Sequence, residues 1–197
     1  MSSKLVMEPT SRVSIIAACA VAIGLLAGCS QRPSTCIVET PQQRYDAAKA
    51  LFERASREFH ISSAQARGYE RTKLEDQALA SYADLVHGYS DQPIWAAQAL
   101  RSLGNIHATR TNLTEAVRAY GDVAEKFPRQ DFEVLMAWKS AGDLLSDLGK
   151  SHEGRVYYEK LLVRFDKPDA LPIVQSVVRG AKARLKGELI LSARDRQ

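Results

Sequence analysis

An internal repeat is the feature that most restricts how this chain can fold. Three segments with one pattern begin at Gln77, Glu115 and Glu153, which gives a 38-residue period. Each contains a small residue, a tyrosine four positions later, an aliphatic residue and a second aromatic residue. The aligned positions are Ala78, Ala116 and Gly154; Tyr82, Tyr120 and Tyr158; Leu85, Val123 and Leu161; and Tyr89, Phe127 and Phe165. A fixed period of this length is typical of stacked units that bury their apolar faces only against their neighbours.

The residues that precede each segment keep the same period. Gly104, Gly142 and Gly180 share one position, and Ala99 aligns with Ala137. Apolar residues recur at spacings of three and four, which predicts helices, and prolines fall only at segment edges. We therefore expect an all-α fold of helix pairs. A small residue lets the two backbones of a pair approach, and the tyrosine fills the space between neighbouring units.

These residues resemble the tetratricopeptide repeat (TPR), whose first helix carries W-x2-L-G-x2-Y and whose second carries A-x3-F and a proline. The two best units read Leu100, Leu103, Gly104, His107, Ala116, Tyr120 and Pro128, then Trp138, Ala141, Gly142, Leu145, Gly154, Tyr158 and Asp166. Three positions differ from the motif: His107 and Leu145 stand where it has tyrosine, and Asp166 stands where it has proline. The period is also longer than the usual length of about 34 residues. The resemblance spans residues 60–187 and implies a TPR-like array of helical hairpins (an α-solenoid), closed by a C-terminal capping helix over 173–189.

The helical region starts at Thr40 and Pro41, which are typical of an N-cap and a first helical position. An apolar stripe then follows at Tyr45, Ala48, Phe52, Ala55 and Phe59. Its spacing predicts a helix at the N-terminal end of the repeats.

The position of the first unit leaves two alternatives. By the period, residues 59–72 form its first helix, with Ala66 at the glycine position and Tyr69 at the tyrosine position. In the other interpretation, the preceding helix continues through Ser62 and Ser63 as one long helix.

The first 28 residues have the pattern of a secretory signal peptide. Lys4 and Arg12 precede a run without charge from Val13 to Ser30, and small residues end the apolar part. A basic segment, an apolar segment and small residues before a cut define such a signal. A membrane anchor and a buried helix are the alternatives. The apolar part, about 16 residues, is shorter than the roughly 20 that span a bilayer, and it is apolar on every face, which disfavours a core helix.

Leu26, Ala27, Gly28 and Cys29 resemble the lipobox of bacterial lipoproteins. The resemblance implies that the chain is cut before Cys29, that the Cys29 sulfur receives a diacylglycerol, and that the new amino group is acylated. A lipid of this kind, such as one with palmitate chains, anchors with about 0.8 kcal/mol per buried methylene group. In enteric bacteria an aspartate after the cysteine retains the protein in the inner membrane, so Ser30 favours the outer membrane.

The chain is thus expected to consist of a signal peptide (1–28), a lipidated tether (29–40), a TPR-like helical domain (41–190) and a polar tail (191–197). Cys36 lies in the tether. It is either an incidental thiol or half of an intermolecular disulfide in an oxidising periplasm.

No motif in the sequence predicts an enzyme, a metal site or a cofactor site. The patterns G-x-S-x-G, H-E-x-x-H, the Walker loop and C-x-x-C are missing. The four histidines lie far apart and the three cysteines precede residue 40, so neither a zinc site nor a disulfide framework is expected. The net charge of +4 is spread along the chain, which does not favour nucleic acid as a partner. We predict no catalytic residue, no metal, no small-molecule substrate and no cofactor besides the covalent lipid on Cys29.

The TPR resemblance predicts a binding surface instead. In that family, partner segments bind in a groove lined by the first helix of each unit. Carried over by register, the groove positions are Gln98, Arg101, Asn105, Thr109, Met136, Lys139, Asp143, Asp147, Val174, Val177, Ala181 and Arg184. The polar side chains can bond a peptide backbone, and the methionine and valines can accept an apolar side chain. The alternatives are ordinary exposed helix residues, or a partner on the convex face, an edge or a helix end.

The lipobox, short tether and long repeats together resemble two groups of envelope proteins. One is the TPR subunit of the outer-membrane β-barrel assembly machinery, which has more repeats than fit in this chain, and the other is the periplasmic TPR protein of the Tol system. We expect a non-enzymatic protein-interaction scaffold, anchored to the outer membrane and facing the periplasm, in outer-membrane assembly or envelope maintenance. Its partner is an envelope protein or a peptide segment. A pilotin-like chaperone for a secretin or pilus component is the alternative, and an envelope hydrolase is a third hypothesis.

Overall fold

A computed structural model describes the backbone of residues 39–194 and the side chains of residues 39–187. This part of the chain consists of seven α-helices and one π-helical segment, with no strand. The elements are α1 (Pro41–Arg54), η1 (Ala55–Ile61), α2 (Gly68–Gly88), α3 (Pro93–Thr109), α4 (Leu113–Lys126), α5 (Asp131–Asp147), α6 (Ser151–Phe165) and α7 (Pro172–Arg194). The predicted all-α class is confirmed for these residues. The predicted signal peptide, Cys29 and Cys36 lie outside them.

The start of α1 has the capping residues expected from the sequence. Thr40 Oγ1 accepts a hydrogen bond from the Gln43 backbone N–H at 3.2 Å, and the Gln43 side chain accepts one from the Thr40 N–H at 2.8 Å. This reciprocal pair satisfies donors that a helix start leaves without partners. Pro41 occupies the first turn, where no backbone N–H is needed.

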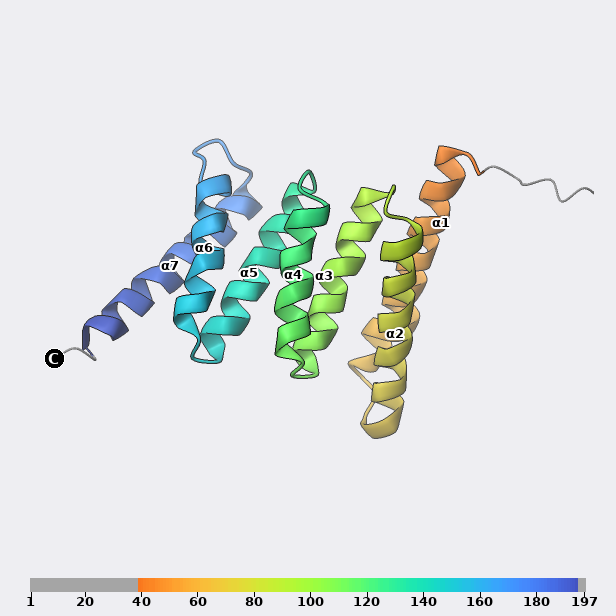
Figure 1. Cartoon of the computed structure of the whole chain (residues 1–197), viewed down its shortest axis with the longest axis horizontal. Coiled ribbons are helices and arrows are strands. Elements are labelled where there is room, and N and C mark those ends of the chain that lie inside the picture. The colour runs from red at the N-terminus through yellow and green to blue at the C-terminus, as the bar shows by residue number, and fades with distance from the viewer. Residues whose placement is uncertain (1–38, 195–197) are drawn as a thin grey trace, which may run out of the picture. The chain divides into compact units, whose positions relative to one another are not determined.

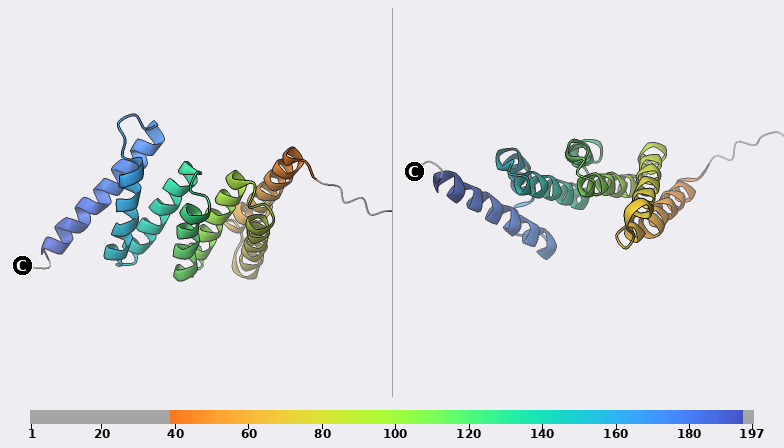
Figure 2. Two further views of the ribbon diagram at one scale, coloured as in Figure 1. Left: turned by 45° about the horizontal axis from the view of Figure 1, so that its top comes forward. Right: turned by 90° about the horizontal axis from the view of Figure 1, so that it is seen from below.

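The helices form two layers (Figures 1 and 2). In Figure 1, α2, α4 and α6 lie nearer the viewer, and α1, α3, α5 and α7 lie behind them. The first set is termed the B layer and the second the A layer. Short turns connect successive helices, so each packs against the next along the chain. Within the A layer, α3 also contacts α5, and α5 contacts α7.

Glycines allow the two layers to meet closely. A Cβ atom added at Gly104 (α3) would lie 2.6 Å from Cε1 of Tyr120 (α4), and one at Gly142 (α5) would lie 2.6 Å from Cε1 of Tyr158 (α6). Gly154 approaches α5 in a similar way, since a Cβ there would lie 2.8 Å from the Gly142 carbonyl oxygen. These distances are much shorter than a normal carbon contact, so only glycine fits at these positions. The junction recurs at the spacing that the 38-residue period predicts.

The first helix pair departs from the prediction based on the period. Residues 59–72 do not form one helix, because the helix from Pro41 continues through η1 to Ser63 and a turn precedes α2. Ala66 lies in that turn, and Tyr69 is 85 % exposed at the start of α2. The assignments of Ala66 and Tyr69 are therefore wrong, and the alternative of one long helix is confirmed.

The contacts of Tyr82 show which residues pack against it in this first pair. Its ring packs against Phe52 of α1, with ring centroids 5.6 Å apart, and against His60 of η1, with centroids 5.8 Å apart. These two residues take the place expected for Ala66. One period before Leu113, where α4 begins, the second helix of this pair would begin at residue 75, whereas α2 already begins at Gly68. The turn between the two helices therefore comes earlier than the 38-residue period places it.

The C-terminal helix α7 has no helix after it in the described chain. Val178 and Ala181 are buried in the hydrophobic core, whereas no side chain or distant backbone atom lies within 4 Å of a Cβ built at Gly180. Gly180 is therefore equivalent in sequence to Gly104 and Gly142, but no tyrosine ring packs against it. The helix extends to Arg194, so residues 191–194 of the predicted polar tail are helical.

Candidate functional site

The predicted groove residues lie on α3, α5 and α7, which are neighbours in the A layer. Two of the twelve are not accessible, because Val177 is 8 % exposed and Ala181 is 3 % exposed. Their prediction as groove residues is wrong, since both belong to the core that holds α7 in place. The other ten form what we term the A-layer row: Gln98, Arg101, Asn105, Thr109, Met136, Lys139, Asp143, Asp147, Val174 and Arg184.

Arg101 connects α3 to α5 within this row. Its Nε donates a hydrogen bond at 2.6 Å to a carboxylate oxygen of Glu133, which is only 6 % exposed. Removing the cation would leave an unpaired charge almost out of contact with water, which is strongly unfavourable. Arg101 therefore has a structural partner already, which sequence reasoning did not identify.

Asp143 is the centre of a second group, which joins α5, α6 and α7. Its carboxylate accepts hydrogen bonds from Lys139 Nζ at 2.5 Å and Tyr158 Oη at 2.6 Å, and Arg184 Nε lies 3.7 Å away. Arg184 also donates to Asp147 at 3.0 Å. Burial and the Asp143 carboxylate both raise the pKa of Tyr158, so its hydroxyl stays protonated and donates. Four residues of the predicted row therefore bond one another.

Asn105 occupies the position equivalent to Asp143 one unit earlier. Tyr120 Oη donates a hydrogen bond to Asn105 Oδ1 at 2.8 Å. Burial raises the pKa of Tyr120 to about 12, so this hydroxyl is also protonated at neutral pH. In both units the tyrosine ring covers the glycine and its hydroxyl binds the next residue of the A helix.

The remaining row residues have more freedom. Thr109 donates to the Ile106 carbonyl oxygen at 2.9 Å and is otherwise exposed, and Gln98 has no polar partner among the described residues. Met136 and Val174 pack partly against the core. Val174 also lines a cavity of about 330 Å³ between the start of α7, the start of α5 and the end of α6. Most hydrogen-bonding groups of the row therefore already have a partner, either within the row or on a neighbouring residue.

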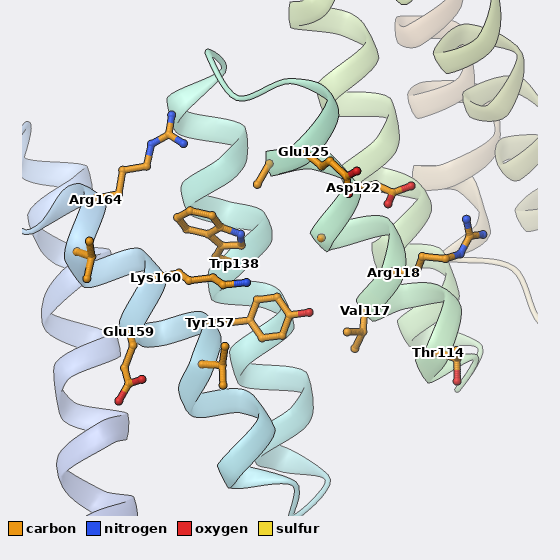
Figure 3. A pocket seen from close by; sticks show the side chains of 14 residues that line it. Thr114, Val117, Arg118, Asp122, Glu125, Trp138, Tyr157, Glu159, Lys160 and Arg164 are labelled. Carbon is orange, nitrogen blue, oxygen red and sulfur yellow. The ribbon is translucent and has the colours of Figure 1, made fainter.

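The opposite face carries a groove between α4 and α6 (Figure 3). Its volume is about 1020 Å³, and Trp138 of α5 forms its floor. Residues of α4 and α6 form its two walls: Val117, Arg118, Gly121, Asp122, Ala124 and Glu125 on one side, and Val156, Tyr157, Glu159, Lys160, Val163 and Arg164 on the other. Charged side chains border the groove, and the side chains at its base are apolar.

The α6 wall exposes unusual apolar surface. Val163 is 89 % exposed and Val156 is 45 % exposed. Trp138 is fixed below them by an edge-on contact with Phe165, with ring centroids 6.2 Å apart, and by the Arg164 guanidinium 5.9 Å from its ring centroid. A contiguous apolar surface in a groove is typical of an interaction site.

A second groove, between α2 and α4, is the preceding repeat of the first. Its volume is about 590 Å³, and Leu100, Leu103 and His107 of α3 form its floor. Leu100 precedes Trp138 by one repeat period, so the two floors are equivalent in sequence. His107 Nδ1 is buried without a hydrogen-bond partner in the described structure. Burial lowers the pKa of His107, although Glu115 opposes this effect.

Sequence reasoning did not predict either groove, although a signal for the larger one exists. Val156 and Val163 lie seven residues apart, outside the stripe of α6 that the repeat predicts to be buried. Two valines on one line of the exposed face indicate apolar surface that the fold does not use.

Two searches of the described residues gave negative results. No group of three or more histidine, cysteine, aspartate or glutamate side chains is arranged to hold a metal ion. None of the described helices combines the length and the apolar character needed to cross a membrane. In comparisons with protein-family models, curated proteins and solved structures, no match to this chain was found.

Proposed function

We propose that this chain is a non-enzymatic scaffold of the bacterial envelope, anchored by lipid to the outer membrane, that recruits a protein partner in the periplasm. The observation that carries the proposal is the junction of Gly104 with Tyr120, repeated one period later by Gly142 with Tyr158. A junction repeated at a fixed period builds an array in which each unit contacts mainly its neighbours, and such arrays present extended binding surfaces.

The same junction supports a TPR-like architecture. Both units combine an A-helix glycine, a B-helix tyrosine and a short turn between the helices, as in the motif that the sequence resembles. The uncovered Gly180 on α7 is consistent with a capping helix, whose role in such arrays is to cover the last hydrophobic interface.

The A-layer row is the surface that we propose for the partner. It extends over α3, α5 and α7, and Gln98 and Thr109 present polar groups at one end of it. The paired charges of Arg184 and Asp147 are exposed enough to exchange bonds with a polar peptide segment, since their side chains are 47 % and 62 % exposed. This chemistry favours an extended, polar segment of an envelope protein, in outer-membrane assembly or envelope maintenance.

Site-specific photo-crosslinking in cells tests the partner. A photoreactive amino acid at Gln98 or Thr109 should give an adduct with another envelope protein, whereas the same amino acid at Asp84, which is exposed on α2 of the B layer, should not. A barrel-assembly or Tol component in the adduct supports the scaffold, and a secretin would favour the pilotin-like alternative. Adducts at Asp84 alone would show that the A-layer row is not the binding surface.

The lipid anchor is tested separately. Cys29→Ser should leave an unprocessed and unacylated chain that no longer fractionates with the outer membrane, because the acylated sulfur is lost. If the variant is still processed and bound to the outer membrane, the lipoprotein proposal is wrong.

A further inference from the structure

We infer that two copies of this chain associate through the α4–α6 groove, with α6 of each copy inserted between α4 and α6 of the other. This inference goes beyond the proposed function and does not depend on it. It concerns the B layer, whereas the recruited partner is assigned to the A layer.

The exposed side of α6 has the form of a ridge suited to such a groove. Val156, Lys160 and Val163 follow one another at spacings of four and three, so they lie on one line of the helix. At the equivalent positions of the preceding units, α4 carries Arg118, Asp122 and Glu125, and α2 carries Ala80, Asp84 and His87. Only α6 of these three helices therefore presents two valines to solvent.

The groove offers an apolar base that two valines can cover. Trp138 lies at its floor, and Val117 and Ala124 of α4 are partly buried in its wall. Gly121 lies on the same wall, and no side chain or distant backbone atom lies within 4 Å of a Cβ built there. A second helix can therefore approach the α4 backbone closely at Gly121. With 15 residues, α6 is about 22 Å long, which gives it several turns of contact.

Charge complementarity identifies the second copy as the occupant. Glu125 on α4 and Lys160 on α6 line opposite walls of the groove, as Figure 3 shows, and neither has an ion-pair partner among the described residues. The Lys160 ammonium lies 5.5 Å from the ring centroid of Tyr157 within the groove. When α6 of a second copy enters, its Lys160 faces Glu125 of the first copy.

Two-fold symmetry doubles each of these contacts. In a symmetric dimer, the contact of Lys160 with Glu125 occurs twice, because each copy supplies one of each. The helices then follow the order α4, α6 of the partner, α6, and α4 of the partner. Trp138 of each copy is covered by the Val156 and Val163 of the other.

Sedimentation equilibrium of the full chain in density-matched detergent tests this inference. All variants carry Cys36→Ser, so that a disulfide in the tether does not contribute to the mass. The parent should have the mass of two chains, and Val163→Glu should have the mass of one, because a charge would face Trp138. Ile94→Glu is the matched control, since Ile94 is 44 % exposed on α3 outside the groove, and it should remain dimeric.

A charge exchange tests the proposed pairing directly. Lys160→Glu and Glu125→Lys should each weaken dimerisation by about tenfold, since each replaces two attractive contacts with two repulsive ones. The double variant restores opposite charges and should recover dimerisation. Far-UV circular dichroism spectra should be unchanged throughout, because both residues are exposed and the helices stay folded. A monomeric parent, a monomeric Ile94→Glu variant, or a double variant weaker than both single ones would overturn the inference.

Discussion

The A-layer row and the α4–α6 groove differ in how two of their charged groups are used. On the A layer, Arg101 binds Glu133, and Asp143 binds Lys139 and Tyr158, so charges connect neighbouring helices. On the B layer, α4 and α6 stand apart over Trp138, and Glu125 and Lys160 have no ion-pair partner in the described structure. The comparison shows that polar residues predicted to bind a partner can instead hold neighbouring helices together. Surface that is free to bind a partner can lie on the opposite face.

Both layers are held together by the contacts of Gly104 with Tyr120 and of Gly142 with Tyr158. Disrupting one of these contacts should therefore cause the largest loss of stability. Gly142→Leu should lower the free energy of unfolding by about 3 kcal/mol, because the new side chain would collide with the Tyr158 ring. Gly104→Leu should cost a similar amount at Tyr120. Thermal denaturation followed by circular dichroism measures both.

Gly180→Ala is the control for this pair. No side chain or distant backbone atom lies within 4 Å of a Cβ built at Gly180. Alanine favours helix by about 1 kcal/mol over glycine, so the melting temperature should stay the same or rise. A loss equal to that of Gly142→Leu would contradict the packing described for α7.

The A layer is tested by removing the cation beside its buried carboxylate. Arg101→Met should lower the free energy of unfolding by about 2 kcal/mol, since Glu133 would keep its charge without a partner. The melting temperature should fall by roughly 4–8 °C.

Two variants sharpen that result. Arg155→Met removes an exposed ion pair with Glu159 on α6, and it should change stability by less than about 0.5 kcal/mol. Adding Glu133→Leu to Arg101→Met should recover part of the loss, because the buried charge is then gone. Equal losses for Arg101→Met and Arg155→Met would show that the A-layer pair is no more structural than a surface one.

The floor of the B-layer groove is tested by Trp138→Leu, which introduces the residue type that Leu100 provides in the other groove. The loss of contact with Phe165 and of buried ring surface should cost about 1–2 kcal/mol. Urea denaturation measures this change. An unaltered midpoint would mean that Trp138 does not support the groove.

The smallest expected effect is the pH dependence of stability that His107 contributes at the floor of the α2–α4 groove. Burial lowers the pKa of His107, so the folded protein favours the neutral ring more than the unfolded chain does. Its contribution to stability is present above the unfolded pKa of about 6.5 and is lost as the pH falls through the lower folded value. The melting temperature should therefore drop between pH 7.5 and pH 5.5.

His107→Leu should reduce this drop, because leucine does not titrate. The next unit already carries a leucine, Leu145, at the equivalent repeat position. The drop should not vanish, since burial also lowers the pKa of His60. Identical pH dependence in the variant and the parent would exclude a contribution from His107.

Much of the fold followed from the sequence. The 38-residue period predicted the helix pairs from α3 to α6, the close approach at Gly104 and Gly142, and a last helix without a successor. Thr40 and Pro41 predicted the start of α1. These predictions rest on local patterns, namely caps and the spacing of small and aromatic residues, which a single segment contains in full.

The first pair and the binding residues could not be predicted in this way. The second helix of the first pair, α2, begins at Gly68, earlier than the position that the period gives from the start of α4, and the period gave no sign of this. Val177 was predicted to be accessible because its position was taken from the register, yet α7 packs with that side inward. Position on one helix does not reveal which side its neighbours will cover.

The sequence by itself therefore determined the all-α class, the repeat and its junctions, because these depend on residues close in the chain or related by a fixed period. The tertiary structure alone decided which charges pair, such as Arg101 with Glu133 across 32 residues, and which surfaces stay open, such as the groove above Trp138. The physical reason is that pairing and exposure depend on the spacing between helices of different units, which no single segment encodes.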